Sequence, residues 1–220
     1  MIMNKFQGIK LVVLDFDGTL ADTLQVILNT MQATLRALDL PPRSDAECKA
    51  MIGLRLTEIP ERLFPDMEGI GPRYAAMYRK QFVAFNVPGA VPLFPGVLET
   101  LHELSRRGFL LSIASSRGHE SLDNYLRDLH LEDIIPFIVA AEDVTQAKPD
   151  PEPVLKTLSH FGLKPQEVLV VGDTDFDILM GRNAGCYTCG VTYGNGSRQS
   201  MLDAGAHALI DNFSQLLDWL

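Results

Sequence analysis

The chain has 220 residues, and 46% of them are hydrophobic, which is ordinary for a folded globular protein and argues against wholesale disorder. A formal net charge of −9 argues against broad binding to nucleic acids or anionic membranes, although an anionic substrate can still bind where local cations neutralise it. No apolar run is long enough to span a bilayer, and the N-terminal sequence MIMNKFQGIK lacks the pattern of a secretory signal. We therefore expect a cytoplasmic protein with no nucleic-acid or membrane partner.

The first predicted element is a buried strand, Leu11–Leu14, because a short continuous apolar run is typical of a strand covered on both faces. Asp15 and Asp17 follow directly, and then Gly18 and Thr19. In open α/β sheets the ligand site lies just beyond the carboxyl ends of such strands. Two neighbouring carboxylates resist joint ionisation unless a cation or hydrogen bonds compensate, so their placement suggests chemistry. Taken alone, the same residues also fit a strand that ends in an acidic turn.

From residue 21 to residue 87 the sequence predicts helices and no strand. The first helix is indicated by an apolar stripe at alternating steps of four and three residues. The stripe consists of Leu24, Leu28, Met31, Leu35 and Leu38. Ser44 and Glu47 have the capping-box spacing of a second helix. A further helix is expected over roughly Leu54–Phe64, although Pro60 disturbs it unless a helix begins nearby, and another starts at Pro72.

Strands and helices alternate from Pro88 onward, after a connection rich in proline and glycine. Strands are expected at Phe109–Ser115, Pro136–Ala141, Glu167–Gly172, Cys186–Tyr193 and Ala208–Ile210. Helices are expected between the first four of these strands, a glycine-rich loop between the last two, and one more helix closes the chain. This alternation predicts right-handed β-α-β crossovers, hence an α/β fold with a parallel sheet and helices on both of its faces.

The first strand belongs to this sheet, although the helical segment separates it from its partners. The simplest architecture is therefore a discontinuous core of residues 1–20 and 88–220. Residues 21–87 form an inserted helical cap, with Leu20–Thr23 as the expected hinge.

Cys186 and Cys189 have the C-x-x-C spacing of redox and zinc sites. They lie in an apolar run that we interpret as a strand, where residues three apart point to opposite faces. No second cysteine pair accompanies them, so a structural role is the better interpretation.

Polar groups follow each of the core strands in turn. The second strand ends in Ser115-Ser116-Arg117, the third precedes Ala147–Pro151, which contains Lys148, and the fourth ends in Gly172–Asp177. Each segment alone also fits a helix cap, a helix start or a turn. Because the carboxyl ends of parallel strands meet at one edge of the sheet, we expect hydroxyl, cationic and acidic groups to converge there on Asp15 and Asp17.

These four segments, in this order, resemble the motifs of the haloacid dehalogenase-like superfamily of phosphohydrolases over nearly the whole chain. The similarity is to the subgroup with a helical cap inserted after the first strand, which includes phosphoglycolate phosphatase, pyrophosphatase-like and β-phosphoglucomutase-like proteins. The C-terminal segment also resembles phosphoglycolate phosphatase-like relatives. The resemblance implies a Rossmann-like sheet whose first strand is central.

The resemblance also implies the chemistry of the site. Asp15 is the expected nucleophile, which forms an aspartyl-phosphate, and Asp17 is the expected general acid and base. Ser115 and Lys148 are expected to bind the phosphate and to neutralise charge during transfer. Mg²⁺ is the implied cofactor, because it binds through a few carboxylates and substrate phosphate. The implied metal-site residues are Asp15, Asp17 through its backbone carbonyl, Asp173, and Asp177, which holds a metal-bound water or orients Lys148.

The remaining candidate residues concern phosphate binding and specificity. The amides of Gly18 and Ser116 are candidate phosphate donors, and Arg55 and Arg117 are candidate substrate ligands. For Arg55 a solvated helix-surface position fits the sequence about equally well.

Two other activities of the superfamily are disfavoured by the sequence. Dehalogenase members lack an acid at the position of Asp17, which argues against carbon–halogen cleavage. Phosphonatases use a cap lysine as a Schiff base, and no lysine clearly matches it, Lys49 being the nearest.

The leading hypothesis is a Mg²⁺-dependent, phosphoglycolate phosphatase-like enzyme that hydrolyses a small phosphorylated metabolite, as a monomer or a homodimer. One alternative is a phosphosugar mutase of the β-phosphoglucomutase type, which returns the phosphoryl group to a sugar. The other is a catalytically silent binding protein that kept the fold.

Overall fold

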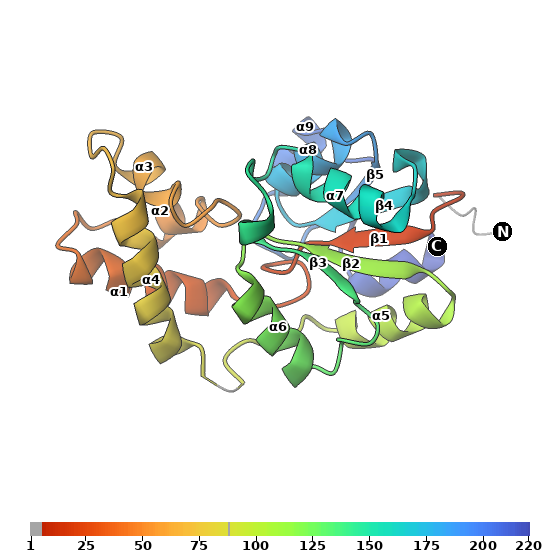
Figure 1. Cartoon of the computed structure of the whole chain (residues 1–220), viewed down its shortest axis with the longest axis horizontal. Coiled ribbons are helices and arrows are strands. Elements are labelled where there is room, and N and C mark those ends of the chain that lie inside the picture. Colours follow the sequence, from red (N-terminus) through yellow and green to blue (C-terminus); the bar gives the residue numbers. More distant parts are fainter. Residues whose placement is uncertain (1–5, 88) are drawn as a thin grey trace.

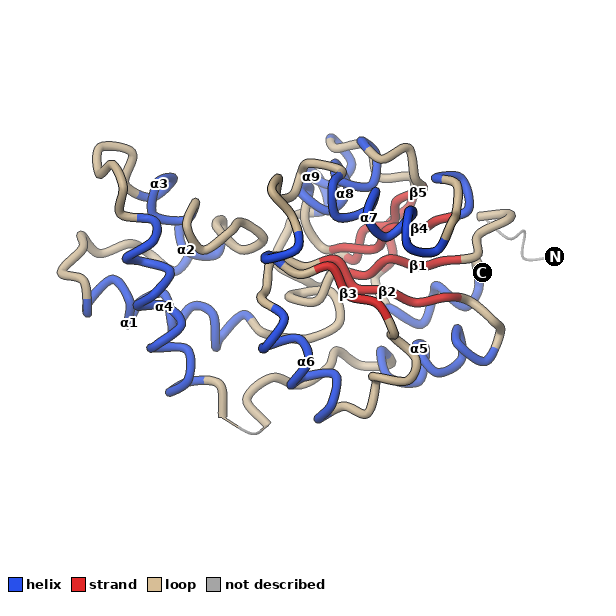
Figure 2. The backbone as a smooth tube through the Cα atoms, viewed as in Figure 1, coloured by secondary structure: helices blue, strands red, loops and turns tan. Residues whose placement is uncertain are grey.

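The computed structural model describes residues 6–87 and 89–220, in which six strands form one parallel sheet (Figures 1 and 2). Their order across the sheet is β3-β2-β1-β4-β5-β6, so the first strand is central and pairs with β2 and β4. The strands are β1 (Leu11–Leu14), β2 (Leu110–Ala114), β3 (Phe137–Val139), β4 (Val168–Gly172), β5 (Tyr187–Val191) and β6 (Ala208–Ile210). The predicted α/β fold with a parallel sheet is confirmed.

Helices cover both faces of the sheet, because alternate side chains of a strand point to opposite sides (Figure 1). Val12 and Leu14 of β1 pack in one apolar cluster with residues of the helices on one face, whereas Leu11 and Val13 pack in another with those on the opposite face. On the first face lie α5 (Val97–Arg106), α6 (His119–Asp128) and the 3-10 helix η3 (Phe213–Asp218); on the other lie α7 (Glu152–Phe161) and α8 (Asp175–Asn183).

Residues 21–87, the cap segment, contain the helices between β1 and β2 and form an apolar cluster of their own. The helices are α1 (Leu24–Ala37), α2 (Asp45–Lys49), α3 (Ile59–Leu63) and α4 (Gly71–Phe85). They lie together at the end of the molecule toward which β1 points (Figure 1). The domain boundaries themselves stay a prediction, and Pro88, which opens the second part of the predicted core, lies outside the described residues, as do residues 1–5.

The expectation of a helix over Leu54–Phe64 is wrong in its extent. Turns occupy its first residues, and α3 begins at Ile59 with Pro60 in its first turn. A proline is tolerated there because the N–H groups of a first turn have no intrahelical partner. The capping box of Ser44 and Glu47 is confirmed, with Glu47 N donating to Ser44 Oγ at 3.2 Å and Ser44 N donating to Glu47 Oε2 at 2.8 Å.

The second half of the chain differs from the sequence-based expectation in four local features. Strand β3 is shorter than Pro136–Ala141, since Pro136 has no N–H to donate and Ala141 begins the 3-10 helix η1 (Ala141–Asp143). A short helix that the sequence does not predict, α9 (Arg198–Asp203), follows β5, and Ser197 caps it. The closing helix is η3, a 3-10 helix. A second 3-10 turn, η2 (Pro165–Glu167), precedes β4.

None of the described helices combines the length and apolar character that a membrane span requires.

Candidate active site

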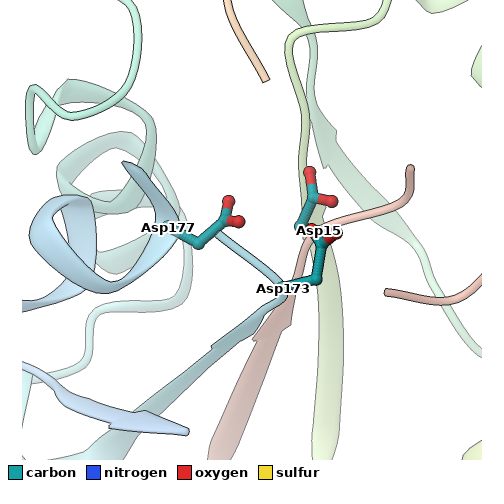
Figure 3. Close-up of side chains that lie close together, drawn as sticks. All are labelled: Asp15, Asp173 and Asp177. Carbon is teal, nitrogen blue, oxygen red and sulfur yellow. The ribbon is translucent and has the colours of Figure 1, made fainter. Parts of the chain in front are cut away.

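Three buried carboxylates lie together where β1 and β4 end (Figure 3). Asp15 follows β1 directly, Asp173 follows β4, and Asp177 lies in the first turn of α8. Because β1 and β4 are adjacent parallel strands, their carboxyl ends bring Asp15 and Asp173 to the same edge of the sheet. One oxygen from each of the three residues lies within 4.8 Å of the others, a spacing at which one cation can contact all of them.

Lys148 supplies a positive charge to this acidic group. Its Nζ donates to Asp15 Oδ1 at 2.6 Å and to Asp177 Oδ1 at 2.6 Å, and the lysine is only 4% exposed. Burial alone lowers the pKa of the Lys148 ammonium, but the two carboxylates outweigh it and raise that pKa above its usual value. The lysine is therefore held charged between the nucleophile candidate Asp15 and Asp177.

One ammonium does not compensate the whole acidic group. Burial raises the pKa of Asp15 to about 7; Lys148 opposes this, and the neighbouring charges of Asp177 and Asp17 add to it. Burial likewise raises the pKa of Asp173 well above its usual value, with Asp15 and Asp177 adding to the effect. Both carboxylates would be stabilised in their charged form by a further cation, and buried carboxylate oxygens are the ligands that Mg²⁺ prefers. The donor set therefore fits the implied magnesium ion.

The oxygens of Asp177 are engaged more fully than those of the other two acids. Its Oδ2 accepts from Thr174 N at 3.1 Å and from Thr174 Oγ1 at 2.7 Å, while its Oδ1 accepts from Lys148. This arrangement fits the expected role of Asp177 in orienting Lys148.

A hydroxyl and a backbone amide that the sequence does not single out contact Asp15 and Asp173. Thr19 Oγ1 lies 3.4 Å from both Asp15 Oδ2 and Asp173 Oδ1, and Asn195 N donates to Asp173 Oδ2 at 2.6 Å. Tyr193 in turn donates from its hydroxyl to Thr19 O at 2.8 Å. A methyl group added to Gly194 would lie 2.4 Å from Asp173 Oδ2, so the loop contacts Asp173 closely. The available signals were the Gly-Thr pair after the first carboxylates and the glycine-rich loop after β5.

If the site has the Mg²⁺-dependent phosphatase activity that the sequence resemblance implies, replacing Thr19 by valine should lower kcat/KM by about three- to tenfold and raise the Mg²⁺ concentration needed for half-maximal activity, because the orienting hydroxyl is lost while the buried shape is kept. Metal-dependent phosphate release would measure both. Thr23→Val is the matched control, since Thr23 is fully buried but its Oγ1 has no hydrogen-bond partner. It should keep normal activity and melt at the same or a slightly higher temperature. Equal activity losses in the two variants would contradict an orienting role for Thr19.

Asp17 forms an ion pair with Arg117. Arg117 Nε donates to Asp17 Oδ2 at 3.1 Å, and its NH2 donates to Asp17 Oδ1, a two-point contact that fixes the carboxylate in direction. The guanidinium lies over the rings of Phe16, Phe82 and Tyr125, at 5.7, 5.2 and 5.3 Å from their centroids. Arg117 therefore contacts the second acid of the site.

The other predicted residues lie at the contact between the cap segment and the sheet edge. Ser115 is buried, and its Oγ accepts from Arg117 N at 3.2 Å. Ser116 Oγ donates to Gly53 O of the cap segment at 2.6 Å. The amide of Gly18 donates to Ala21 O at 2.9 Å.

Arg55 extends from the cap segment to the loop after β3. Its NH1 donates to Thr145 O at 2.9 Å, and its NH2 donates to Val144 O and, at 3.5 Å, to Ala141 O. All three acceptors are backbone carbonyls on the far side of the cleft, so the side chain connects the cap segment to the sheet domain.

A cavity of about 530 Å³ opens above the acids, between the cap segment and the sheet edge. Eight predicted site residues line it: Asp15, Asp17, Arg55, Ser115, Ser116, Arg117, Asp173 and Asp177. Gly18 and Lys148 do not line the cavity, and Lys148 lies buried behind Asp15. Carboxylates, hydroxyls and cations from distant parts of the chain thus line one cavity.

The two cysteines of the C-x-x-C spacing lie apart from this site. Cys186 packs in the apolar cluster on one face of the sheet and Cys189 in the cluster on the other. This placement agrees with the structural interpretation of the pair.

Comparison with known proteins identifies the family of the chain. The family model described as haloacid dehalogenase-like hydrolase matches residues 12–191. The phosphoglycolate phosphatase of Rhodospirillum rubrum is 31% identical over 220 residues, and the alignment covers 96% of this chain and 90% of that protein. The pyrophosphatase PpaX of Halalkalibacterium halodurans is 34% identical over 185 residues, and the alignment covers 84% of this chain and 84% of that protein. A Bacteroides fragilis crystal structure, whose name assigns it to the same hydrolases, has a TM-score of 0.89 at 28% identity and covers 94% of this chain and 99% of its own. The resemblance seen in the sequence is thereby confirmed, and the chain belongs to the haloacid dehalogenase-like hydrolase family.

Proposed function

We propose that the protein is a Mg²⁺-dependent phosphoric monoester hydrolase that acts on a small phosphorylated metabolite through an aspartyl-phosphate intermediate. The observation that carries this proposal is the arrangement around Asp15. Its carboxylate lies at the end of the central strand, beside Asp173, and accepts a hydrogen bond from the Lys148 ammonium. Asp15 lines the cavity together with Asp17. The phosphatase names of the relatives support the same activity.

In the proposed reaction an oxygen of Asp15 attacks phosphorus, and the bond from phosphorus to the leaving oxygen breaks. Asp17 gives its proton to that oxygen, then accepts a proton from the water that hydrolyses the aspartyl-phosphate. The two-point contact with Arg117 holds Asp17 as a carboxylate, the form that accepts the proton of the water, and one of the two oxygens leaves Arg117 when Asp17 carries the proton that it gives to the leaving oxygen. Lys148 keeps a positive charge beside the attacking carboxylate throughout.

Mg²⁺, when bound, would neutralise charge on the substrate phosphate and on the attacking carboxylate. Asp15, the backbone carbonyl of Asp17, and Asp173 are the proposed ligands, while Asp177 orients Lys148 and can hold a water of the ion. Ser115 is the proposed hydroxyl donor to a phosphate oxygen.

The Ser116 amide remains a predicted phosphate donor. The predicted donation from the Gly18 amide would require that amide to give up its bond to Ala21 O, and Gly18 does not line the cavity. Arg55, whose guanidinium already donates to backbone carbonyls, remains a predicted substrate-facing residue of the cap segment. The cytoplasmic location, and a monomeric or homodimeric state, also remain predictions.

A screen of phosphorylated metabolites tests the proposal, with phosphoglycolate, pyrophosphate and sugar phosphates in the panel. Phosphate release should require Mg²⁺, stop with a chelator, and return when the ion is restored. Asp173→Asn should raise the Mg²⁺ concentration for half-maximal activity by about 10- to 100-fold, because a ligand charge is lost. Folded protein that releases no phosphate from any ester would contradict the proposal. If glucose 1-phosphate gives an isomeric sugar phosphate without free phosphate, the mutase alternative is correct.

A further inference from the structure

We propose that Arg55 of the cap segment is a positioning residue for Lys148, and that it acts by fixing the loop that carries this lysine into the site. The inference rests on the proposed phosphatase activity, in which Lys148 keeps a positive charge beside the attacking carboxylate. It gives the cap segment a part in the chemistry, because the lysine is then fully placed only while Arg55 reaches that loop.

Arg55 donates hydrogen bonds to three carbonyls of the loop that connects β3 to Lys148. Its NH1 donates to Thr145 O at 2.9 Å, and its NH2 donates to Val144 O and, at 3.5 Å, to Ala141 O. Thr145 precedes Lys148 by only three residues. A displacement of these carbonyls is therefore transmitted to the lysine over a very short stretch of backbone.

This loop depends on side-chain hydrogen bonds for its shape. Val144 and Thr145 belong to no helix or strand, and of the described residues only Arg55 donates to their carbonyls. The amides of Thr145 and Gln146 donate to Glu152 Oε2, at 3.0 and 2.7 Å. The loop is therefore held from two sides, on its carbonyls by an arginine of the cap segment and on its amides by a carboxylate of α7.

The guanidinium of Arg55 suits this role by its shape. A planar guanidinium can reach the carbonyls of several residues at once, whereas a lysine ammonium is a single point charge on a flexible stem. Within the described chain the acceptors of Arg55 are carbonyl oxygens and not carboxylates, and its Nε is buried without a hydrogen-bond partner. An anionic group of a substrate can therefore also bind this arginine, a role that predicts a different set of kinetic effects.

The turn that carries Arg55 contacts two other loops of the site. It lies between α2 and α3 and extends toward the sheet edge (Figure 1). Gly53 O accepts from Ser116 Oγ, in the loop after β2, at 2.6 Å. A Cβ added to Gly53 would lie 3.3 Å from the ring of Phe176, which is in the first turn of α8 and packs against the apolar cluster of the cap segment. These contacts fix the backbone near Arg55 relative to the sheet.

Lys148 is the group on which the position of the loop acts. Its Nζ donates to Asp15 Oδ1 and to Asp177 Oδ1, both at 2.6 Å. Stabilisation of charge by such a group depends on its placement, and a misplacement of about 1 Å can lower a rate by about 10²-fold. A looser loop therefore lowers the rate for every phosphate ester, whatever its leaving group carries, because Lys148 serves the step that all of them share.

Arg55→Met tests the inference, because it removes the donors and keeps the apolar stem of the side chain. With ethyl phosphate and phosphoglycolate as substrates, kcat should fall by about 10- to 100-fold for both, and the ratio of their kcat/KM values should stay within about twofold of the wild-type ratio. Arg55→Lys should recover less than about threefold of the loss. Arg62→Met makes the same change at an exposed arginine of α3 and should keep normal kcat.

Two further measurements follow the loop itself. In hydrogen exchange without any substrate, the amides of Thr145 and Gln146 should exchange at least about tenfold faster in Arg55→Met and at the wild-type rate in Arg62→Met. Glu152→Ala loosens the same loop from a residue that does not line the cavity, and it should lower kcat for both esters by about threefold or more.

A fall confined to phosphoglycolate, with normal kcat for ethyl phosphate, would show that Arg55 binds a second anion of the substrate and would overturn the inference. Unchanged exchange of the loop in Arg55→Met, or normal kcat in Glu152→Ala, would overturn it as well. Each of these results leaves the phosphatase proposal intact, because the wild-type protein still releases phosphate. If the wild-type protein hydrolyses neither ester nor any member of the wider panel, the phosphatase proposal fails and this inference with it.

Discussion

Replacing Asp15 by asparagine should abolish turnover, with kcat at least about 10⁴-fold lower, because an amide cannot attack phosphorus as a carboxylate does. The fold should persist. Burial raises the pKa of the Asp15 carboxyl to about 7, so the surroundings disfavour the negative charge of this side chain. Asparagine has the same shape and no charge, and therefore avoids the free-energy cost of burying that charge. Phosphate release under saturating Mg²⁺ measures the first effect, and thermal unfolding followed by circular dichroism measures the second.

Asp22→Asn is the matched control for this variant, since it makes the same chemical change on an exposed residue near the end of the same segment. It should retain normal kcat and normal stability. Near-normal phosphate release from Asp15→Asn would contradict the assignment of the nucleophile. Loss of the folded circular dichroism signal in Asp15→Asn alone would instead show that the carboxylate is needed for the fold.

The sheet could be predicted from the sequence because its central strands are unbroken apolar runs. Leu11–Leu14 and Val168–Gly172 are buried throughout, as the pattern indicates for parallel strands covered on both faces. The position of the acids then follows, since adjacent parallel strands end at one edge. The extents of α3, β3 and the last helix could not be predicted, because hydrogen bonding in the folded chain decides where each element begins and ends.

The pairings within the site could not be predicted, because they depend on side-chain directions and on how the cap segment docks. Arg117 is a candidate substrate ligand by its position after β2, yet its guanidinium binds Asp17, 100 residues away in the chain. Arg55 likewise binds carbonyls of the loop after β3. Neither contact has a local sequence signature. Both contacts position a guanidinium group that lines the cavity.

Lys148→Met should lower kcat by about 10²- to 10³-fold and the free energy of unfolding by about 3–5 kcal/mol. The activity falls because no ammonium remains beside the attacking carboxylate. Stability falls because Asp15 and Asp177, only 7% and 2% exposed, lose the cation that both contact at 2.6 Å. Urea denaturation at neutral pH without Mg²⁺ measures the stability change.

Two further variants test whether the unpaired charges cause that loss. Adding Asp177→Asn to Lys148→Met should recover part of the lost stability, since one of the uncompensated carboxylates is then neutral. Lys10→Met breaks a surface pair instead: Lys10 Nζ lies 2.7 Å from Glu167 Oε1, but the lysine side chain is 61% exposed, so the expected cost is only about 0–1 kcal/mol. If Lys148→Met costs no more than Lys10→Met, the buried ion pairs do not stabilise the site. If the double variant is as unstable as Lys148→Met, the destabilisation arises from lost packing and not from uncompensated charge.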